Sequence, residues 1–213
     1  NEDGTKVIVV NGEIYNYQGI REDLISKGHT FKTKTDTEVI LHGYEEYGPE
    51  VLNKFRGMFG IAIWDLTEKE LFIARDFFGI KPMYYAQVDN NLIFGSEIKC
   101  ILTHPNVKKE LNESALQNYL SFQYGVPNDT FFKNIYCLQP GHYLKFKDGK
   151  LEITRYWKPD FKIDDTWDEE KLVEEIDKTF KNSVEAHKIS DVEVGCFLSS
   201  GVDSSYVATQ FKG

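Results

Sequence analysis

A serine-rich loop near the end of the chain restricts the fold more than any other stretch. An apolar run, residues 194–198, leads into the loop, and a helical pattern over 206–211 follows it. This succession predicts a strand, a turn and a helix, and such a strand requires parallel neighbours. The N–H groups of the turn and of the helix N-terminus then point to one place, which suits an anion. The loop consists of Leu198, Ser199, Ser200, Gly201, Val202, Asp203, Ser204 and Ser205.

The residue types in this loop favour phosphate as the anion. Serine hydroxyls can donate to phosphate oxygens, and Gly201 lets the backbone approach closely. No lysine follows Gly201, so the loop is not a Walker A sequence. A polar turn with a serine cap is the plainer interpretation, but the order Ser-Ser-Gly-Val-Asp-Ser-Ser after an apolar run favours a nucleotide site. It resembles the Ser-Gly-Gly-aliphatic-Asp-Ser motif of ATP pyrophosphatases, except that Ser200 stands in a glycine position, where a positive φ would cost about 1 kcal/mol or more.

Composition and charge exclude several classes of function. The chain has 213 residues, of which 41% are hydrophobic and 28% charged, as in folded globular proteins. Its net charge of -9 is the opposite of what sequence-independent nucleic-acid binding requires, so we expect no nucleic-acid partner. No apolar run approaches membrane-spanning length and no basic-then-apolar leader opens the sequence, so we expect no membrane association.

Cysteine and histidine spacing predicts neither disulfides nor a metal centre. Cys100, Cys137 and Cys196 lie far apart without a CxxC pair, and we expect them to be reduced and mostly buried, as in a cytoplasmic protein. The five histidines have no metal-ligand spacing, so we expect no structural metal.

The first part of the chain predicts a strand that leads into a helix. Residues 6–10 are β-branched and apolar, and Asn11, Gly12 and Glu13 are expected to end the strand. Asn-Gly is most often a tight turn, but the helical pattern over 14–27 favours a turn at a sheet edge, where binding groups are common.

Residues 29–34 predict a second short strand. Thr35 and Glu38 have the spacing of a capping box, which opens a helix that ends before Gly48. Asp36 would then stand in the first helical turn. A carboxylate there is stabilised by the helix dipole and is also held in place for a ligand ammonium, so the two roles are compatible.

The pattern from residue 57 onward is mainly β. The expected strands are 58–64, 70–74, 83–86, 92–94, 142–146 and 151–157, and the expected helices are 97–102 and 113–122. Antiparallel hairpins with flanking helices predict a layered α/β sandwich. Residues 159–165 are the expected linker. Thr166 and Glu169 predict a second capping box, at the start of an amphipathic helix that leads to the serine loop.

Five motifs together resemble the glutamine-hydrolysing asparagine synthetases. They are residues 11–16 (NGEIYN), 36–41 (DTEVIL), 71–84 (LFIARDFFGIKPMY), 94–99 (FGSEIK) and the serine loop, in the family order. The resemblance covers almost the whole chain and implies an α+β fold. A four-layer αββα N-terminal-nucleophile (Ntn) hydrolase sandwich, without its first strands, would precede the first β-loop-α unit of a parallel α/β ATP-pyrophosphatase domain. The implied parts are an incomplete glutaminase domain at 1–158, the linker at 159–165 and the beginning of the synthetase domain at 166–213.

The same resemblance implies a reaction and the residues that carry it. Glutamine hydrolysis would supply ammonia through a tunnel to a β-aspartyl-adenylate made from aspartate and ATP, giving asparagine, AMP and pyrophosphate. Asn11 and the Gly12 N–H would form the oxyanion hole, where loss of one donor typically costs about 10²–10³ in rate. With them, Glu13 and Asp36 would bind glutamine by holding its α-ammonium. ATP would lie on residues 198–205 with Mg2+, which Asp203 would help to hold, and no metal would be bound by protein ligands alone.

Other functions stay open beside this one. The family nucleophile is an N-terminal cysteine, whereas this chain begins with Asn1, so we expect an excerpt of a larger enzyme that is inactive by itself. An asparagine-synthetase-like enzyme with another acceptor would carry the same motifs, because the acceptor pocket is expected beyond Gly213. A non-catalytic Ntn-like module for binding or assembly is the alternative from another class. The oligomeric state, including a homodimer, also stays open.

Overall fold

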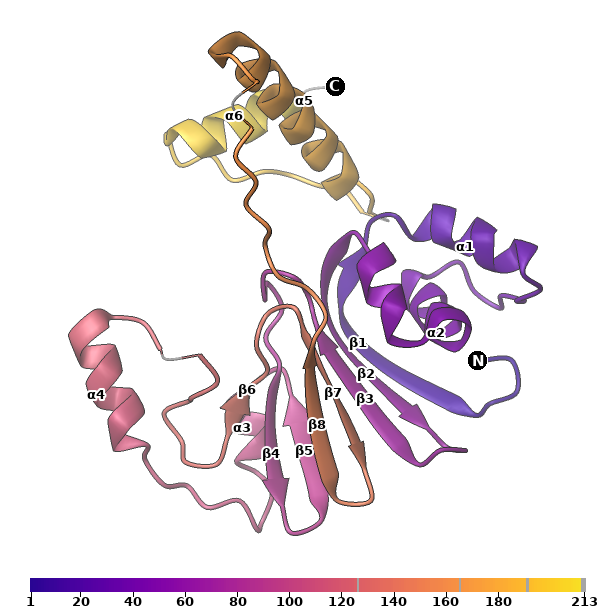
Figure 1. Cartoon of the computed structure of the whole chain (residues 1–213), viewed down its shortest axis with the longest axis vertical. Coiled ribbons are helices and arrows are strands. Elements are labelled where there is room, and N and C mark those ends of the chain that lie inside the picture. The colour runs from indigo at the N-terminus through magenta and orange to yellow at the C-terminus, as the bar shows by residue number, and fades with distance from the viewer. Residues whose placement is uncertain (126, 165, 191, 212–213) are drawn as a thin grey trace. The chain divides into compact units, whose positions relative to one another are not determined.

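Two antiparallel sheets form the scaffold of the first part of the chain (Figure 1). The structure is a computed structural model that describes residues 1–125, 127–164, 166–190 and 192–211. The chain forms two compact units, Asn1–Lys158 and Pro159–Gly213. No helix among the described residues is both long and apolar enough to cross a membrane.

The larger sheet has five strands in the order β1-β2-β3-β7-β8, and the smaller sheet has three in the order β5-β4-β6. The five strands are β1 (Lys6–Ile14), β2 (Gly57–Asp65), β3 (Glu70–Arg75), β7 (His142–Lys147) and β8 (Lys150–Arg155). The three strands are β4 (Tyr84–Val88), β5 (Asn91–Gly95) and β6 (Tyr136–Cys137). Every neighbouring pair is antiparallel, as the hairpin pattern of the sequence predicts.

Both units contain helices. The first unit contains α1 (Tyr17–Ser26), α2 (Asp36–Tyr47), a 3-10 helix over Gly48–Lys54, α3 (Ile98–Ile101) and α4 (Glu113–Phe122). The second unit contains α5 (Glu169–His187) and α6 (Val202–Phe211). Helices α1 and α2 cover one face of the five-stranded sheet (Figure 1).

Alternation along the strands sends side chains to separate cores on the two faces of each sheet. Phe59 and Ile61 of β2 pack with Leu24 of α1 and Ile40 of α2. Each of these side chains is almost fully buried, and burial of one such side chain stabilises the fold by about 1.5–3 kcal/mol. This cluster joins the two helices to the five-stranded sheet.

The opposite face of the five-stranded sheet packs on the three-stranded sheet. Ile73 of β3 and Leu144 of β7 contact Tyr85 of β4 in a second cluster. Ala86, the next residue of β4, points the other way and packs with Ile101 of α3 in a third cluster. The layers are therefore helix, sheet, sheet and helix, so the predicted α+β fold and its αββα order are confirmed.

Strand β1 is longer than the sequence predicts. It continues through Asn11, Gly12 and Glu13 to Ile14, and all of these residues pair with β2. The prediction of a turn at Asn-Gly is wrong. Glycine is needed here because β1 and β2 approach each other closely, and a Cβ on Gly12 would lie 2.1 Å from the Met58 carbonyl oxygen. The binding motif is thus part of the sheet.

The segment between α1 and α2 is not a strand, although its sequence predicts one over residues 29–34. The Glu38 side chain accepts hydrogen bonds from the backbone N–H groups of Lys32 (2.7 Å) and Thr33 (2.6 Å). Thr35 caps α2 as predicted, with Oγ1 3.4 Å from Glu38 N. The backbone donors of the segment are therefore satisfied by a side chain and need no neighbouring strand.

The second unit lacks the strand expected over residues 193–198. A parallel strand is stable only beside another strand, and no other strand lies among the described residues of this unit. The cap of α5 is also not the predicted Thr166, because Asp168 accepts from Lys171 N at 2.9 Å. Asp165, part of the expected linker, lies outside the described residues.

The cysteines are free but less buried than expected. Cys137 is half-buried, whereas Cys100 and Cys196 are exposed. Cys100 lies in the single turn of α3, of which Ile101 faces the core, and Cys196 lies in the segment without strand partners. Burial raises the pKa of the Cys137 thiol against the opposing effect of Arg75.

Candidate active site

The end of β1 and the beginning of α2 meet through one hydrogen bond. Ile14 N donates to Asp36 Oδ2 at 2.9 Å, and both residues are at least partly buried. The predicted glutamine-binding residue Asp36 therefore lies beside Glu13, although the two are far apart in the sequence. Among the residues that the structure describes, Asp36 Oδ1 has only a long contact with Thr37 Oγ1, at 3.5 Å, so this oxygen is available to a ligand cation.

Gly12 has a backbone conformation that other residues rarely adopt. Its φ is +154°, and its position pairs with Phe59 of β2. Gly57 faces the same restriction from the opposite strand, because a Cβ there would lie 2.1 Å from the Glu13 carbonyl oxygen. Two glycines thus let β1 and β2 approach each other more closely than side chains would permit. The backbone of the predicted oxyanion-hole residue is fixed by this approach.

The Asn11 side chain reaches the other sheet. Its Nδ2 donates to Ser96 Oγ at 3.0 Å, and Ser96 follows the end of β5. The site residues therefore stand where the two sheets come together. Ser96 was not predicted as a site residue. It belongs to the motif at residues 94–99, and its position as a polar residue inside that motif is the signal that could have identified it.

A buried carboxylate organises the loop that follows β3. Asp76 is 1% exposed. Its Oδ1 accepts from the N–H groups of Phe78 (3.1 Å) and Ile80 (2.9 Å). Its Oδ2 accepts from Phe59 N (3.2 Å) and Lys81 N (2.9 Å), so the loop is tied to β2. A buried carboxylate that accepts several backbone N–H groups satisfies those donors and holds its loop rigidly.

The Arg75 side chain binds the carbonyl groups of the same loop. Its guanidinium donates to the carbonyl oxygens of Gly79 (2.8 Å), Lys81 (2.7 Å) and Leu138 (2.7 Å). The Tyr156 hydroxyl donates to the Arg75 carbonyl oxygen at 2.7 Å. Burial raises the pKa of that hydroxyl, and the nearby Asp76 carboxylate raises it further. Sequence reasoning placed Arg75 and Asp76 inside a family motif but assigned them no role.

The serine loop of the second unit has a local structure of its own. Ser200 has a φ of +62°, so the conformation that its glycine position suggested is present. Ser204 Oγ lies 3.0 Å from Ser199 Oγ, accepts from Ser199 N at 3.2 Å, and donates to the Gly201 carbonyl at 3.1 Å. Asp203 lies in the first turn of α6. Leu198 and Val202 are exposed, and Ser205 N donates to Gly201 O at 3.0 Å.

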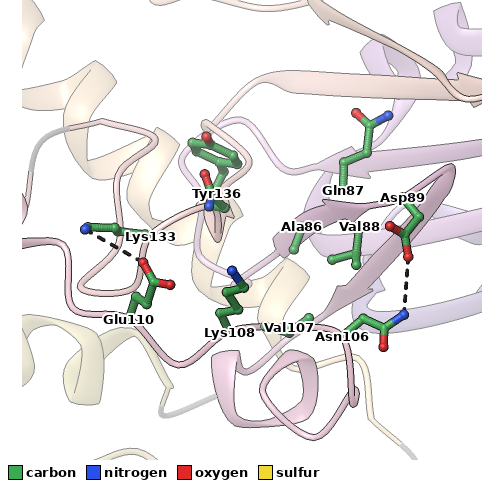
Figure 2. Close-up of a pocket in the computed structure, with 11 residues that line it drawn as sticks. Ala86, Gln87, Val88, Asp89, Asn106, Val107, Lys108, Glu110, Lys133 and Tyr136 are labelled. Carbon is green, nitrogen blue, oxygen red and sulfur yellow. Dashed lines mark hydrogen bonds and ion pairs between the residues drawn. The ribbon is translucent and has the colours of Figure 1, made fainter.

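A cavity of about 580 Å³ in the first unit is lined by none of the predicted site residues (Figure 2). Its polar lining is partly paired within itself: Lys133 Nζ is 3.8 Å from Glu110 Oε2, and Asn106 Nδ2 donates to Asp89 Oδ2 at 3.2 Å. Figure 2 shows the Lys133–Glu110 pair on the side of Tyr136 and the Asn106–Asp89 pair on the opposite side, next to Val88.

The comparisons with known proteins agree with the two parts of the chain. Residues 1–157 match the family described as the glutamine amidotransferase domain, and residues 175–212 match the family described as asparagine synthase.

Three curated relatives match along nearly the whole chain. Glutamine-hydrolysing asparagine synthetase 1 of Bacillus subtilis (strain 168) is 42% identical over 99% of this chain and 33% of its own length. A putative glutamine-hydrolysing asparagine synthetase 2 of Methanocaldococcus jannaschii is 38% identical over 94% of this chain and 39% of its own length. The amidase chyE of Penicillium rubens is 32% identical over 98% of this chain and 31% of its own length. The chain thus spans about a third of the length of these relatives.

Proposed function

This chain belongs to the glutamine amidotransferase domain family, and on that premise we propose that it is part of a glutamine-hydrolysing asparagine synthetase. The observation that supports the proposal is the hydrogen bond between Asp36 and Ile14 N, which holds the Asp36 carboxylate at the end of β1, on the residue that follows Glu13 in the chain. Residues 1–158 form the glutaminase part in this proposal, and 166–213 begin the part that makes the amide.

Glutamine binds at the end of β1 in this proposal. Asp36 Oδ1 and the Glu13 carboxylate hold the α-ammonium, because two anions on one cation orient it without taking its proton. The amide oxygen of glutamine displaces Ser96 from Asn11 Nδ2 and also accepts from the Gly12 N–H. These donors stabilise the negative charge that develops on that oxygen as the amide carbon becomes tetrahedral.

ATP binds at residues 198–205 in the second part. The positive φ of Ser200 and the hydroxyl groups of Ser199 and Ser204 support a phosphate-binding turn at the start of α6. Mg2+ would accompany ATP, with Asp203 as its protein partner. The adenylate of aspartate forms there, and ammonia from glutamine displaces AMP to give asparagine.

Assays of the complete gene product test both halves of the proposal. With glutamine, ATP, Mg2+ and aspartate we expect asparagine, AMP and pyrophosphate in equal amounts. Asn11→Ala should lower the glutaminase kcat about 10²–10³-fold with little change in KM, because the lost donor acts in the transition state. Asp36→Asn should mainly raise KM for glutamine, whereas the exposed Asp89→Asn should leave both constants unchanged.

Further variants separate the two reactions. Asp203→Ala should abolish asparagine formation while glutamine hydrolysis continues, and persistent synthesis would remove the serine loop from the nucleotide site. Equal losses in KM and kcat for Asn11→Ala would remove Asn11 from the oxyanion hole. Light scattering of the same preparation decides between a monomer and a homodimer, and fractionation of the source cells tests the expected cytoplasmic location.

A different acceptor is the second candidate function, because a relative that is not named an asparagine synthetase, the amidase chyE, is similar along 98% of this chain. The glutaminase half would be unchanged, and another carboxylate would replace aspartate. Release of pyrophosphate with a panel of amino-acid and peptide carboxylates, but not with aspartate, would favour this candidate.

A further inference from the structure

Two histidines and two glutamates from three separate segments meet beside α2. His42 and Glu45 lie on α2, His29 precedes that helix, and Glu2 precedes β1. One potential ligand atom from each residue lies within 4.8 Å of the other three. The spacing of the histidines in the sequence predicted no metal centre, because only the fold brings these segments together.

Three distances within this cluster are close to the edges of a tetrahedral metal site, and one ligand atom from each residue lies within 4.8 Å of the others. His42 Nδ1 is 3.1 Å from both Glu2 Oε2 and Glu45 Oε2, and His29 Nδ1 is 3.5 Å from Glu2 Oε1. Ligand atoms about 2.0–2.2 Å from a Zn2+ ion in tetrahedral geometry are about 3.3–3.6 Å from one another. Small rotations of the glutamate side chains would therefore complete the site.

The surroundings hold two of the four side chains in place. The His42 side chain is 1% exposed, and its ring packs edge-on against Phe31 with centroids 4.7 Å apart. Glu45 Oε1 accepts from Asn1 Nδ2 at 2.5 Å, which leaves Oε2 directed at His42. His42 Nδ1 and Glu45 Oε2 are thus held facing each other.

Each histidine also has a carboxylate beyond its second nitrogen. His29 Nε2 is 3.5 Å from Glu46 Oε2, and His42 Nε2 is 3.6 Å from Glu38 Oε1. His42 Nε2 is buried and has no hydrogen-bond partner within 3.5 Å among the described residues. Metal-bound histidines almost always direct their second nitrogen to a carboxylate, carbonyl or water, because that contact fixes the ring and strengthens its basicity.

The charges of the cluster leave room for a divalent cation. The contacts join five carboxylates (Glu2, Glu38, Glu45, Glu46 and Asp65) to two ammonium groups, since Lys6 Nζ is 3.2 Å from Asp65 and 4.0 Å from Glu45 and Lys27 Nζ is 3.0 Å from Glu46. Three negative charges remain when both imidazoles are neutral. Imidazole nitrogens favour Zn2+ and its transition-metal neighbours over Mg2+ and Ca2+.

We propose that Glu2, His29, His42 and Glu45 form a site for one Zn2+ ion, which ties the segment before β1 to α2. Metal binding would stabilise the first unit, because a site assembled from three segments exists only in the folded chain. The site is separate from the residues assigned to glutamine and ATP, so it stands or fails independently of the proposed function.

Calorimetric titration with Zn2+ tests the proposal on the purified protein after treatment with a chelator. We expect one saturable equivalent of Zn2+, a rise in Tm upon addition, and no such response to Mg2+. Co2+ in place of Zn2+ should give the intense visible absorption of a four-coordinate site. Absence of saturable Zn2+ binding by the folded protein would overturn the proposal.

Variants assign the ion to these four residues. His29→Gln and Glu2→Gln change partly exposed side chains and should each weaken Zn2+ binding at least 10-fold. His104→Gln, at a histidine outside the cluster, is the matched control and should bind as the parent does. If His42→Gln does not fold, the other two variants still decide. Unchanged binding in both His29→Gln and Glu2→Gln, with circular dichroism like that of the parent, would place the ion elsewhere and contradict the proposal.

Discussion

The two units of this chain carry equally clear sequence motifs but differ in how their apolar residues are used. In the first unit, Phe59, Ile61 and Ile73 are at most 1% exposed. In the second unit, Phe197 is 99% exposed and Val202 is 85% exposed. The serine loop nevertheless adopts its turn, with Ser200 at a φ of +62°. A turn can therefore be encoded by a few adjacent residues, whereas a strand also requires a partner.

The largest expected effect concerns the close approach of β1 and β2 in the first unit. Gly12→Ala should lower the free energy of unfolding by at least about 3 kcal/mol, because the new Cβ would meet the Met58 carbonyl and the φ of +154° would be strained. Denaturant unfolding measures the change. Gly19→Ala in α1, where a Cβ meets nothing within 4 Å, is the control and should stabilise by about 1 kcal/mol or less. Similar effects at both positions would show that the strand contact is not restrictive.

The next effect concerns the buried carboxylate of the same unit. Asp76→Asn should destabilise the protein by about 2 kcal/mol. Both carboxylate oxygens accept from backbone N–H groups in the parent, and in the variant an NH2 donor would replace one of these acceptors. The same unfolding experiment detects it. Asp148→Asn, at an exposed turn residue with φ of +51°, should change stability very little. A neutral Asp76→Asn would mean that the loop is held chiefly by Arg75.

In the second unit, one substitution by glycine should stabilise the structure. Ser200→Gly should stabilise the serine loop by about 1 kcal/mol, because glycine adopts a positive φ without a steric penalty. Hydrogen exchange of the α6 amides measures this local change. Ser205→Gly, inside α6, should instead destabilise the helix by a few tenths of a kcal/mol to about 1 kcal/mol. If both substitutions destabilise α6, the positive φ of Ser200 carries no strain.

The smallest effect depends on pH. Burial would raise the pKa of Asp65, but hydrogen bonds from Glu68 N and the charge of Lys6 outweigh it and lower the pKa below its usual value. A carboxyl with a lowered pKa in the folded state stabilises the fold above its unfolded pKa, and this stabilisation is lost as pH falls through the folded pKa. Asp65→Asn should therefore cost about 0.5–1 kcal/mol at pH 7 and almost nothing near pH 2. Unfolding curves at the two values test this; an equal cost at both would assign the effect to packing.

Local patterns in the sequence predicted most of the first unit. The alternation over 58–64 and 70–74 places β2 and β3, and Thr35 correctly marks the cap of α2. The same reasoning misread Asn11 and Gly12 as a turn. Asn-Gly favours positive φ in any context, and only the neighbouring β2 decides that this glycine is used for strand contact.

The candidate site was predictable only where its residues are adjacent in the sequence or lie within a motif. Asn11, Gly12, Glu13 and Asp36 were all named, but the bond from Ile14 N to Asp36 depends on how α2 packs on the sheet. Ser96 could not be placed beside Asn11 before the second sheet was known. The glutamate and histidine cluster was missed for the same reason, since its members come from three segments.

Arg75 and Asp76 have a consequence for how freely the loop after β3 can change. These adjacent side chains satisfy backbone groups of residues 78–81: the arginine binds carbonyl oxygens and the aspartate binds N–H groups. The side chains of Phe78 and Ile80 meanwhile lie at the surface, 71% and 58% exposed. The path of the loop therefore does not depend on these two side chains, so substitutions there would change the surface of the loop while its backbone keeps its course.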